Sequence, residues 1–290
     1  MRPTLQSITL DVDGMTVTGI RQFVKEAQSQ PRLLCLHGWL DNANSFVPMM
    51  PFLPAFDLIA VDLPGHGYSD PLTKGYQQAE VMVHVVKIMQ ALDWNDCHLI
   101  GHSMGGCIAP LIAVATPERI SSLTLIEAAG PLSEKAEALP ERLGRALHDR
   151  LTPEKYASRT FANKEEAVAA RLKVAKMHTA SAKLIIDRQV IEGGDGLRWR
   201  FDPALRMASY QYQTEEQVHA ILSAISCPTL SIVANQGYLA TRSETAERLG
   251  QIRHHTTVSL TGYHHVHMDT PEPVAAAINQ FLGTTPALGG

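Results

Sequence analysis

Residues 101–106 read Gly-His-Ser-Met-Gly-Gly and directly follow the apolar run at residues 97–100. The residues after them, to about position 116, have a helix-like composition. A G-x-S-x-G sequence between a strand and a helix is typical of a sharp, strained turn that exposes the serine hydroxyl. Large side chains beside such a turn would clash, which accounts for Gly101, Gly105 and Gly106. The pattern therefore predicts that Ser103 is a nucleophile.

Composition limits the kinds of protein that this chain can be. Its 290 residues, 45% of them hydrophobic and 19% charged, fit one large α/β domain with room for an insertion. A net charge of −4 argues against a nucleic-acid partner. No apolar run is long enough to span a membrane, and residues 1–6 lack a secretory h-region. The four cysteines have no zinc-ligand spacing, so we expect no metal site. They are typical of small buried side chains in a reducing compartment, which favours the cytoplasm. We expect a monomer or a homodimer.

Hydrophobic patterning predicts alternating strands and helices. Segments 5–13 and 15–23 alternate in polarity and predict an antiparallel hairpin that turns at Asp13-Gly14. Short apolar runs predict buried strands at 32–36, 56–61, 99–100, 122–126, 229–233 and 257–260. Helical spacing is found at 77–92, 243–249 and 272–282. This alternation indicates an α/β protein with a mainly parallel sheet.

One long segment interrupts this alternation. From Gly130 to about Gln213 we find no buried strand, and the segment is charged, helical and punctuated by proline. Such a span is too long for an ordinary loop and predicts an inserted helical subdomain. We therefore divide the chain into a core at residues 1–130 and 214–290 and a cap at residues 131–213. The cap is expected to cover the site at Ser103, although a helical decoration remote from the chemistry is the alternative.

Four motifs occur in an order that resembles a known family. They are LHGW at 36–39, DLPGHGYSD at 62–70, GHSMGG at 101–106 and GYHHVHMDTPEPV at 262–274. Between about residues 32 and 282 the chain resembles the α/β-hydrolase fold superfamily, and segments 36–46 and 198–205 resemble its serine hydrolase-like proteins. The resemblance implies an eight-stranded, mostly parallel sheet with helices on both faces, an inserted helical cap, and ester hydrolysis without a cofactor.

Three histidines follow the last predicted strand and compete for the role of general base. His264 lies seven residues before Pro271, the position at which members of the superfamily commonly carry the catalytic histidine. His265 is the alternative base, and His267 matches a structural histidine of the superfamily. A metal cluster in this run is disfavoured because it has neither an HExxH helix nor a cysteine partner.

The acid that orients the histidine is less obvious. Most of the superfamily places an aspartate after the strand at 229–233, but residues 235–242 contain no carboxylate. A variant of the family uses the end of the preceding sheet strand, where Glu127 follows the run 122–126. A carboxylate there could orient His264 and stabilise its imidazolium, so we predict a Ser103–His264–Glu127 triad. The alternative is a solvated glutamate beside a Ser–His dyad.

Two backbone N–H groups are expected to stabilise the oxyanion. One belongs to Met104, which follows the nucleophile, and the other to Trp39, where Gly38 permits the necessary turn. The Trp39 indole is expected to wall the substrate pocket, with packing under the cap as the alternative. His37 is a further pocket candidate, although a structural role in shaping its loop is favoured. Asp41 or Asn42 caps the helix that follows.

These parts together predict a hydrolase that cleaves carboxylic esters of small-to-medium acyl substrates through an acyl-enzyme, with a small-molecule ester as its partner. Thioesterases, lactonases and C–C bond hydrolases use the same machinery, and the sequence does not distinguish them. A ligand-sensing pseudo-hydrolase with little turnover is a different class. Only the missing carboxylate after residues 229–233 favours that reading.

Overall fold

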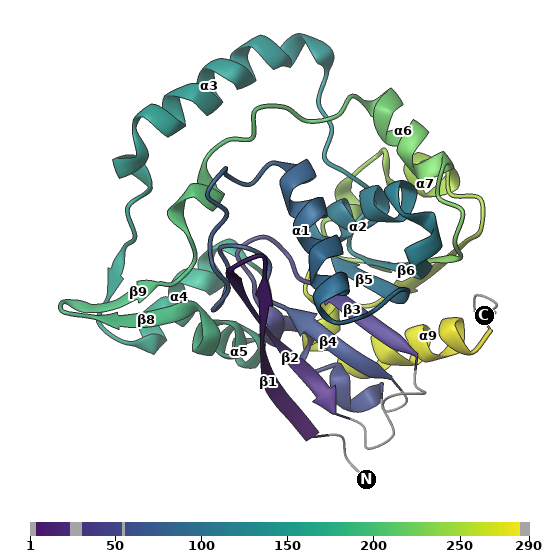
Figure 1. Cartoon of the computed structure of the whole chain (residues 1–290), viewed down its shortest axis with the longest axis horizontal. Coiled ribbons are helices and arrows are strands. Elements are labelled where there is room, and N and C mark those ends of the chain that lie inside the picture. Colours follow the sequence, from purple (N-terminus) through teal and green to yellow (C-terminus); the bar gives the residue numbers. More distant parts are fainter. Residues whose placement is uncertain (1–3, 24–30, 54–55, 285–290) are drawn as a thin grey trace.

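The computed structural model describes residues 4–23, 31–53 and 56–284 (Figure 1). Its centre is an eight-stranded sheet with the strand order β1-β2-β4-β3-β5-β6-β10-β11. The strands are β1 (Thr4–Val12), β2 (Met15–Phe23), β3 (Arg32–Leu36), β4 (Asp57–Val61), β5 (Cys97–His102), β6 (Ile120–Ile126), β10 (Thr229–Ala234) and β11 (His255–Leu260). The predicted α/β fold with an eight-stranded sheet is confirmed.

The sheet is antiparallel only at its β1 end. β1 pairs with β2, and β2 with β4, in antiparallel fashion, whereas the pairs from β4 through β3, β5, β6 and β10 to β11 are all parallel. The hairpin turns at Asp13-Gly14 as predicted, with positive φ at both residues. β4 and β6 are buried along their whole length, as expected for parallel strands covered on both faces.

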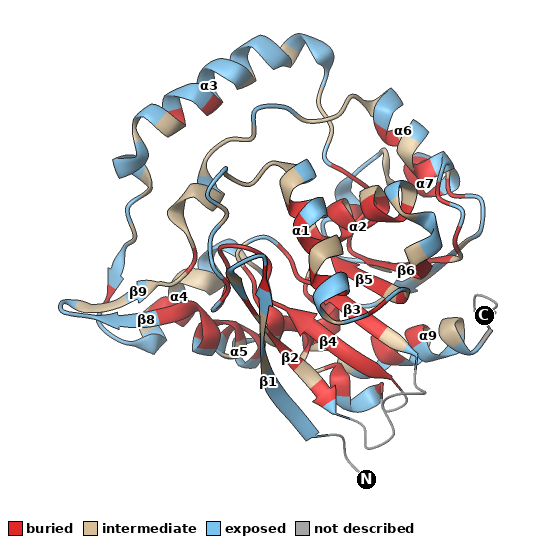
Figure 2. Ribbon diagram, in the orientation of Figure 1, coloured by how far each residue is buried: buried red, intermediate tan, exposed pale blue. Residues whose placement is uncertain are grey.

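Helices cover both faces of the sheet, and the alternation of side chains along β3 shows how. Leu34 and Leu36 belong to the apolar cluster that also contains residues of α1 (Gln78–Ala91), α2 (Met104–Ala115), α6 (Glu215–Ser223) and α7 (Thr245–Gly250). Leu33 and Cys35 point to the other face, into the cluster that includes Val274 and Ile278 of α9 (Pro271–Thr284). In Figure 2 the central strand β4 is buried along its length, whereas β1 at the edge of the sheet is largely exposed.

Between β6 and α6 the chain forms a separate set of elements. The helices are α3 (Leu139–Leu151), α4 (Lys164–Val174) and α5 (Thr179–Gln189). The segment contains the expected helices, but β7 (Thr160–Phe161), β9 (Gly196–Trp199) and β8 (Val190–Gly193) also form a three-stranded sheet that the sequence did not indicate. Strands of two to four residues are too short to produce a recognisable alternation in sequence. The division at residues 131 and 213 stays a prediction.

The parallel strands bring distant parts of the sequence to one edge. The chain leaves β3, β5, β6, β10 and β11 at their carboxyl ends, and in a parallel sheet these ends lie together. The loops that follow these strands carry Trp39, Ser103, Glu127, Gly237 and His264. The candidate site is therefore assembled at this edge.

Candidate active site

Ser103 occupies a strained turn between β5 and α2. Its backbone has φ 50° and ψ −113°, a conformation that non-glycine residues rarely adopt. The neighbouring glycines are required for space: a Cβ on Gly105 would lie 2.1 Å from the Leu36 carbonyl oxygen, and one on Gly106 would lie 2.4 Å from the Ala128 Cβ. The turn therefore has the geometry that the G-x-S-x-G pattern predicts.

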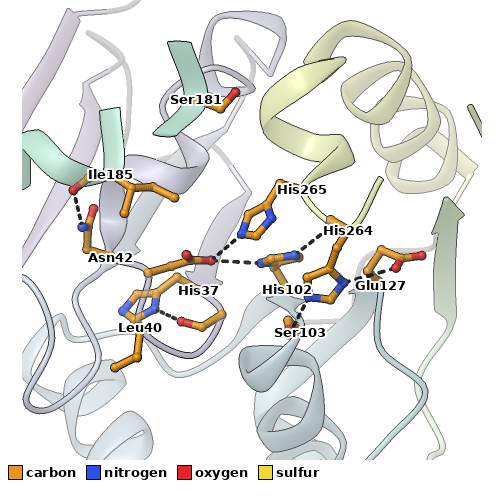
Figure 3. Close-up of polar contacts among 12 residues, drawn as sticks. His37, Leu40, Asn42, His102, Ser103, Glu127, Ser181, Ile185, His264 and His265 are labelled. Carbon is orange, nitrogen blue, oxygen red and sulfur yellow. Dashed lines mark hydrogen bonds and ion pairs between the residues drawn. The ribbon is translucent and has the colours of Figure 1, made fainter. Parts of the chain in front are cut away.

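Ser103, His264 and Glu127 form a continuous hydrogen-bonded chain (Figure 3). The His264 Nε2 atom lies 2.9 Å from the Ser103 Oγ atom, and His264 Nδ1 lies 3.2 Å from Glu127 Oε2. His264 Nδ1 faces a carboxylate and is therefore the protonated nitrogen, which leaves Nε2 free to accept the hydroxyl proton. A serine, a base and an orienting acid in this order can carry out nucleophilic acyl transfer.

The carboxylate of Glu127 is held by the loop after β10. Oε1 accepts a hydrogen bond from the Ala234 N–H at 2.7 Å, and Oε2 accepts one from the Tyr238 N–H at 2.7 Å. Gly237 makes room for it, because a Cβ at that position would lie 2.1 Å from Oε2. The loop that has no acid of its own thus encloses an acid from the neighbouring strand. Sequence reasoning missed Gly237, and no sequence pattern marks it.

His265 points away from the serine and belongs to a second, buried cluster. Its Nε2 atom lies 3.2 Å from Asp41 Oδ2, and Arg171 of α4 forms an ion pair with the other oxygen of Asp41. Burial by itself raises the pKa of Asp41, but Arg171 and His265 outweigh this effect and hold that pKa well below its usual value. His265 is therefore occupied in this cluster, and only His264 contacts Ser103 among these two histidines.

His102 connects this buried cluster to His264. Its Nδ1 atom lies 3.6 Å from Asp41 Oδ2, and its Nε2 atom lies 2.9 Å from the backbone carbonyl oxygen of His264. Burial lowers the pKa of His102 to about 4, so the ring is neutral at pH 7. The nitrogen that faces a carbonyl oxygen must donate, which places the proton on Nε2. His102 therefore fixes the backbone at His264.

Asp41, His102 and His265 bring three potential metal ligands within 4.8 Å of one another. Arg171 contacts Asp41 and also lies 3.3 Å from His265 Nε2. Its positive charge at the same atoms opposes the binding of a divalent cation. We therefore assign this group a structural role.

The loop after β3 contains the other predicted site residues. His37 is completely buried: its Nε2 accepts the Leu63 N–H at 2.9 Å, and its Nδ1 donates to the Gly38 carbonyl oxygen at 2.7 Å. The expectation that His37 lines the substrate pocket is wrong, because both ring nitrogens are used to shape the loop. Asn42, and not Asp41, caps the following 3₁₀ helix, η2 (Ala43–Phe46).

Trp39 and Met104 lie beside the serine. The Trp39 side chain is 51% exposed, lines the cavity, and donates from Nε1 to the Leu205 carbonyl oxygen at 2.9 Å. Met104 opens α2, so its N–H has no acceptor within the helix. Both residues are placed so that their N–H groups are candidates for an oxyanion hole, a role that stays a prediction.

A cavity of about 960 Å³ lies over the serine. Ser103, Met104, Glu127 and His264 form its floor on the sheet side, and α3 and the segment around residues 202–212 contribute the opposite wall. Among the helices that the structure describes, none has the length and apolar character needed to cross a bilayer.

The fold and this site together define an α/β hydrolase. The family model described as the alpha/beta hydrolase fold matches residues 31–271, and the chain belongs to this family. It is 29% identical over 266 residues to the serine hydrolase-like protein of Danio rerio, an alignment that covers 86% of this chain and 81% of that protein. The resemblance noted from short motifs is thereby confirmed.

Two solved structures are similar over nearly the whole chain. One is a hypothetical protein from Pseudomonas aeruginosa PAO1, with a TM-score of 0.90 and 28% identity, covering 96% of this chain and 99% of that one. The other is the thioesterase domain from the curacin biosynthetic pathway, with a TM-score of 0.81 and 23% identity, covering 95% and 99%. The second similarity concerns the fold alone.

Proposed function

We propose that this protein is a serine hydrolase that cleaves carboxylic esters of small-to-medium acyl substrates through an acyl-enzyme intermediate. One observation carries the proposal: His264 lies 2.9 Å from the Ser103 hydroxyl and 3.2 Å from the Glu127 carboxylate. The cavity of about 960 Å³ above the serine is at the upper end of the range found for small-molecule sites, and this supports the proposed substrate size.

In the proposed mechanism the Ser103 oxygen attacks the ester carbonyl while His264 Nε2 takes its proton. The Glu127 carboxylate stabilises the imidazolium that forms, and the N–H groups of Met104 and Trp39 stabilise the oxyanion. His264 then gives the proton to the departing alcohol, which leaves the acyl group on Ser103. A water molecule, deprotonated by the same histidine, releases the acid and restores the serine. Every proton transfer is assigned to this chain's own residues.

The alternatives to ester hydrolysis differ in the bond that is cleaved. The same residues would serve a thioesterase, a lactonase or a C–C bond hydrolase, and one structural neighbour is named a thioesterase domain. A ligand sensor with little turnover is favoured only by the missing carboxylate in the loop after β10. Because Glu127 can supply that carboxylate, we do not favour this alternative. We retain the cytoplasm as the proposed location, since all four cysteines are free.

Replacement of Ser103 tests the proposal. Ser103→Ala should reduce kcat for p-nitrophenyl butyrate by up to about 10⁶-fold, because the attacking atom is removed. Circular dichroism of the variant should match the wild type. A variant that retains more than a few per cent of the wild-type kcat would contradict the proposed nucleophile.

A further inference from the structure

We propose that the cavity binds an acyl substrate whose far end carries an oxyanion, a carboxylate or a phosphate, and that Arg145, Arg150 and Arg206 hold this group. The inference rests on the proposed serine hydrolase function and adds a substrate class to it. Arg145 and Arg150 lie on α3, and Arg206 ends η7 (Pro203–Arg206).

One cavity contains both the candidate nucleophile and the three arginines. Ser103 and His264 line it on the sheet side, and Arg145, Arg150 and Arg206 line it on the opposite side. Seven lysine and arginine side chains contribute to its wall, against three carboxylates, one of which is Glu127 beside His264. The side chains that line the cavity are therefore net positive.

Other arginines of this wall are already neutralised by carboxylates. Arg142 forms an ion pair with Glu134, Arg242 lies 2.7 Å from Glu244, and Arg248 lies 2.6 Å from Glu215. Each of these arginines already has a carboxylate partner in the protein, so its charge does not call for a ligand.

The three arginines of the proposed site differ in this respect. In the described part of the chain, none of them has a carboxylate within ion-pair distance. Asp149, on the same helix as Arg145 and Arg150, accepts the Ala208 N–H at 2.9 Å. This hydrogen bond and the more distant charge of Arg145 lower the pKa of Asp149, but Arg145 does not form an ion pair with it. The cluster thus keeps positive charge available for a substrate.

Aromatic rings and carbonyl groups orient two of these guanidinium groups without neutralising them. Arg150 lies 4.0 Å from the centre of the Tyr210 ring and donates from one nitrogen to the Ala208 carbonyl oxygen at 2.9 Å. Arg206 lies 5.6 Å from the centre of the Tyr156 ring. Each guanidinium has five N–H donors, so donors remain for an oxyanion. Stacked arginines bind carboxylate and phosphate groups with two parallel hydrogen bonds.

The orientation of α3 favours a ligand-binding role for its arginines over a role as solvated surface residues. Leucines at every fourth position form one exposed row, at 38–71% exposure: Leu139, Leu143, Leu147 and Leu151. Arg145 and Arg150 of the same helix line the cavity. Arg145, two residues after Leu143, lies on the opposite side of the helix from the leucine row, whereas Arg150, three residues after Leu147, lies beside that row. In Figure 2, α3 lies at the rim of the molecule and is mostly exposed. A helix placed by apolar burial alone would turn its leucines toward the protein. Here the leucines are exposed and Arg145 lines the cavity from the other side of the helix.

The test compares charged and neutral substrates that are otherwise matched. One arm uses mono-p-nitrophenyl esters of succinic to suberic acid and their methyl-capped, uncharged counterparts. The other uses acetyl thioesters of 4′-phosphopantetheine and of pantetheine, which place a phosphate on the leaving group. In at least one arm the wild type should show at least about a tenfold higher kcat/KM for the charged member. This preference should decrease at high ionic strength.

Variants assign the preference to the arginines. Arg145→Gln, Arg150→Gln and Arg206→Gln combined should bring the charged-to-neutral ratio of kcat/KM close to one. Single Arg150→Gln should lower the ratio severalfold and serves if the triple variant does not fold. Arg198→Gln, on β9 outside the cavity wall, is the control and should leave the ratio unchanged.

The outcomes separate this inference from the proposed function. Hydrolysis of neutral and charged esters at equal rates in both arms would overturn the inference and leave the serine hydrolase proposal intact. A preference that persists in the triple variant would also overturn it. Absence of hydrolysis in all arms, together with an unreactive Ser103, would contradict the proposed function itself.

Discussion

At the scale of single residues, the Glu127 carboxylate occupies the space that a side chain at position 237 would fill. The sequence identified Glu127 because a carboxylate at the end of a buried strand is conspicuous. It did not identify Gly237, since positions 127 and 237 meet only through the pairing of β6 with β10. Position in the sequence favoured His264 over His265, and in the structure His264 is the one that contacts Ser103. The contact of His265 with Asp41 and Arg171 required coordinates.

Gly237→Ala should impair the reaction through the position of the acid. The new Cβ would lie 2.1 Å from Glu127 Oε2, so the carboxylate must move away from His264 Nδ1. Since a displacement of about 1 Å can reduce a rate about 100-fold, we expect a loss of kcat between 10- and about 100-fold. Gly250→Ala, where the added Cβ meets nothing within 4 Å, is the matched control. Equal activity of the two variants in ester hydrolysis would refute the steric argument.

Glu127→Gln should be more severe than Gly237→Ala. The amide cannot stabilise the imidazolium as a carboxylate does, and we expect kcat to fall by about 10³–10⁴-fold. Asn235→Ala removes the polar side chain nearest to the usual position of the acid, and should change kcat little. The comparison is made by steady-state kinetics on one ester. An unchanged kcat in Glu127→Gln would show that another group orients His264.

At the scale of elements, buried polar contacts attach α5 to the core. Arg188 and Asp62 form an ion pair with the closest atoms 2.6 Å apart and both side chains almost inaccessible. Asn42 donates to the Ile185 carbonyl oxygen at 2.9 Å (Figure 3). Ser181 donates to Asp269 at 2.6 Å. These contacts join segments more than 80 residues apart, so periodicity within either segment contains no information about them.

Arg188→Met should destabilise the protein strongly. It leaves the Asp62 carboxylate buried without its cation, which typically costs about 3–5 kcal/mol in the free energy of unfolding. Lys164→Met is the control, because the Lys164–Asp187 pair is half exposed and its loss should cost less than about 1 kcal/mol. Urea unfolding measures both variants. Similar losses in the two would contradict the importance that we give to the buried pair.

At the scale of the whole molecule, buried histidines should make stability depend on pH. Burial lowers the pKa of His66 to about 3 and that of His102 to about 4, whereas a histidine in the unfolded chain titrates near about 6.5. Below pH 6.5 the unfolded chain therefore binds more protons than the folded chain, and stability falls as the pH decreases toward 4. The pKa of Asp62 is lowered by Arg188 against the effect of its burial, so its contribution is lost at still lower pH.

His66→Gln should reduce this pH dependence. Between pH 7 and pH 5 the neutral, buried His66 accounts for about 2 kcal/mol of lost stability, a contribution that glutamine cannot make. Denaturant unfolding at both pH values gives the difference for the wild type, for His66→Gln, and for the exposed control His254→Gln. If all three proteins lose the same free energy, the buried histidine is not the cause.

The molecule also shows which levels of structure a sequence can predict. Local patterns sufficed for the strands of the central sheet, for Ser103 and for the histidine that contacts it, because each depends on a short run of residues. The short strands at residues 160–199, the enclosure of Glu127 and the arginine wall of the cavity did not follow. Each of these depends on how separate segments pack, which periodicity does not encode.

The most direct test of the central claim is the reaction of Ser103 with a fluorophosphonate, followed by intact-protein mass spectrometry and peptide mapping. A serine activated by His264 should form one adduct per chain, located at Ser103, and the rate should fall by several orders of magnitude in His264→Ala. Labelling no faster than that of the urea-unfolded protein, or located at another residue, would contradict the account.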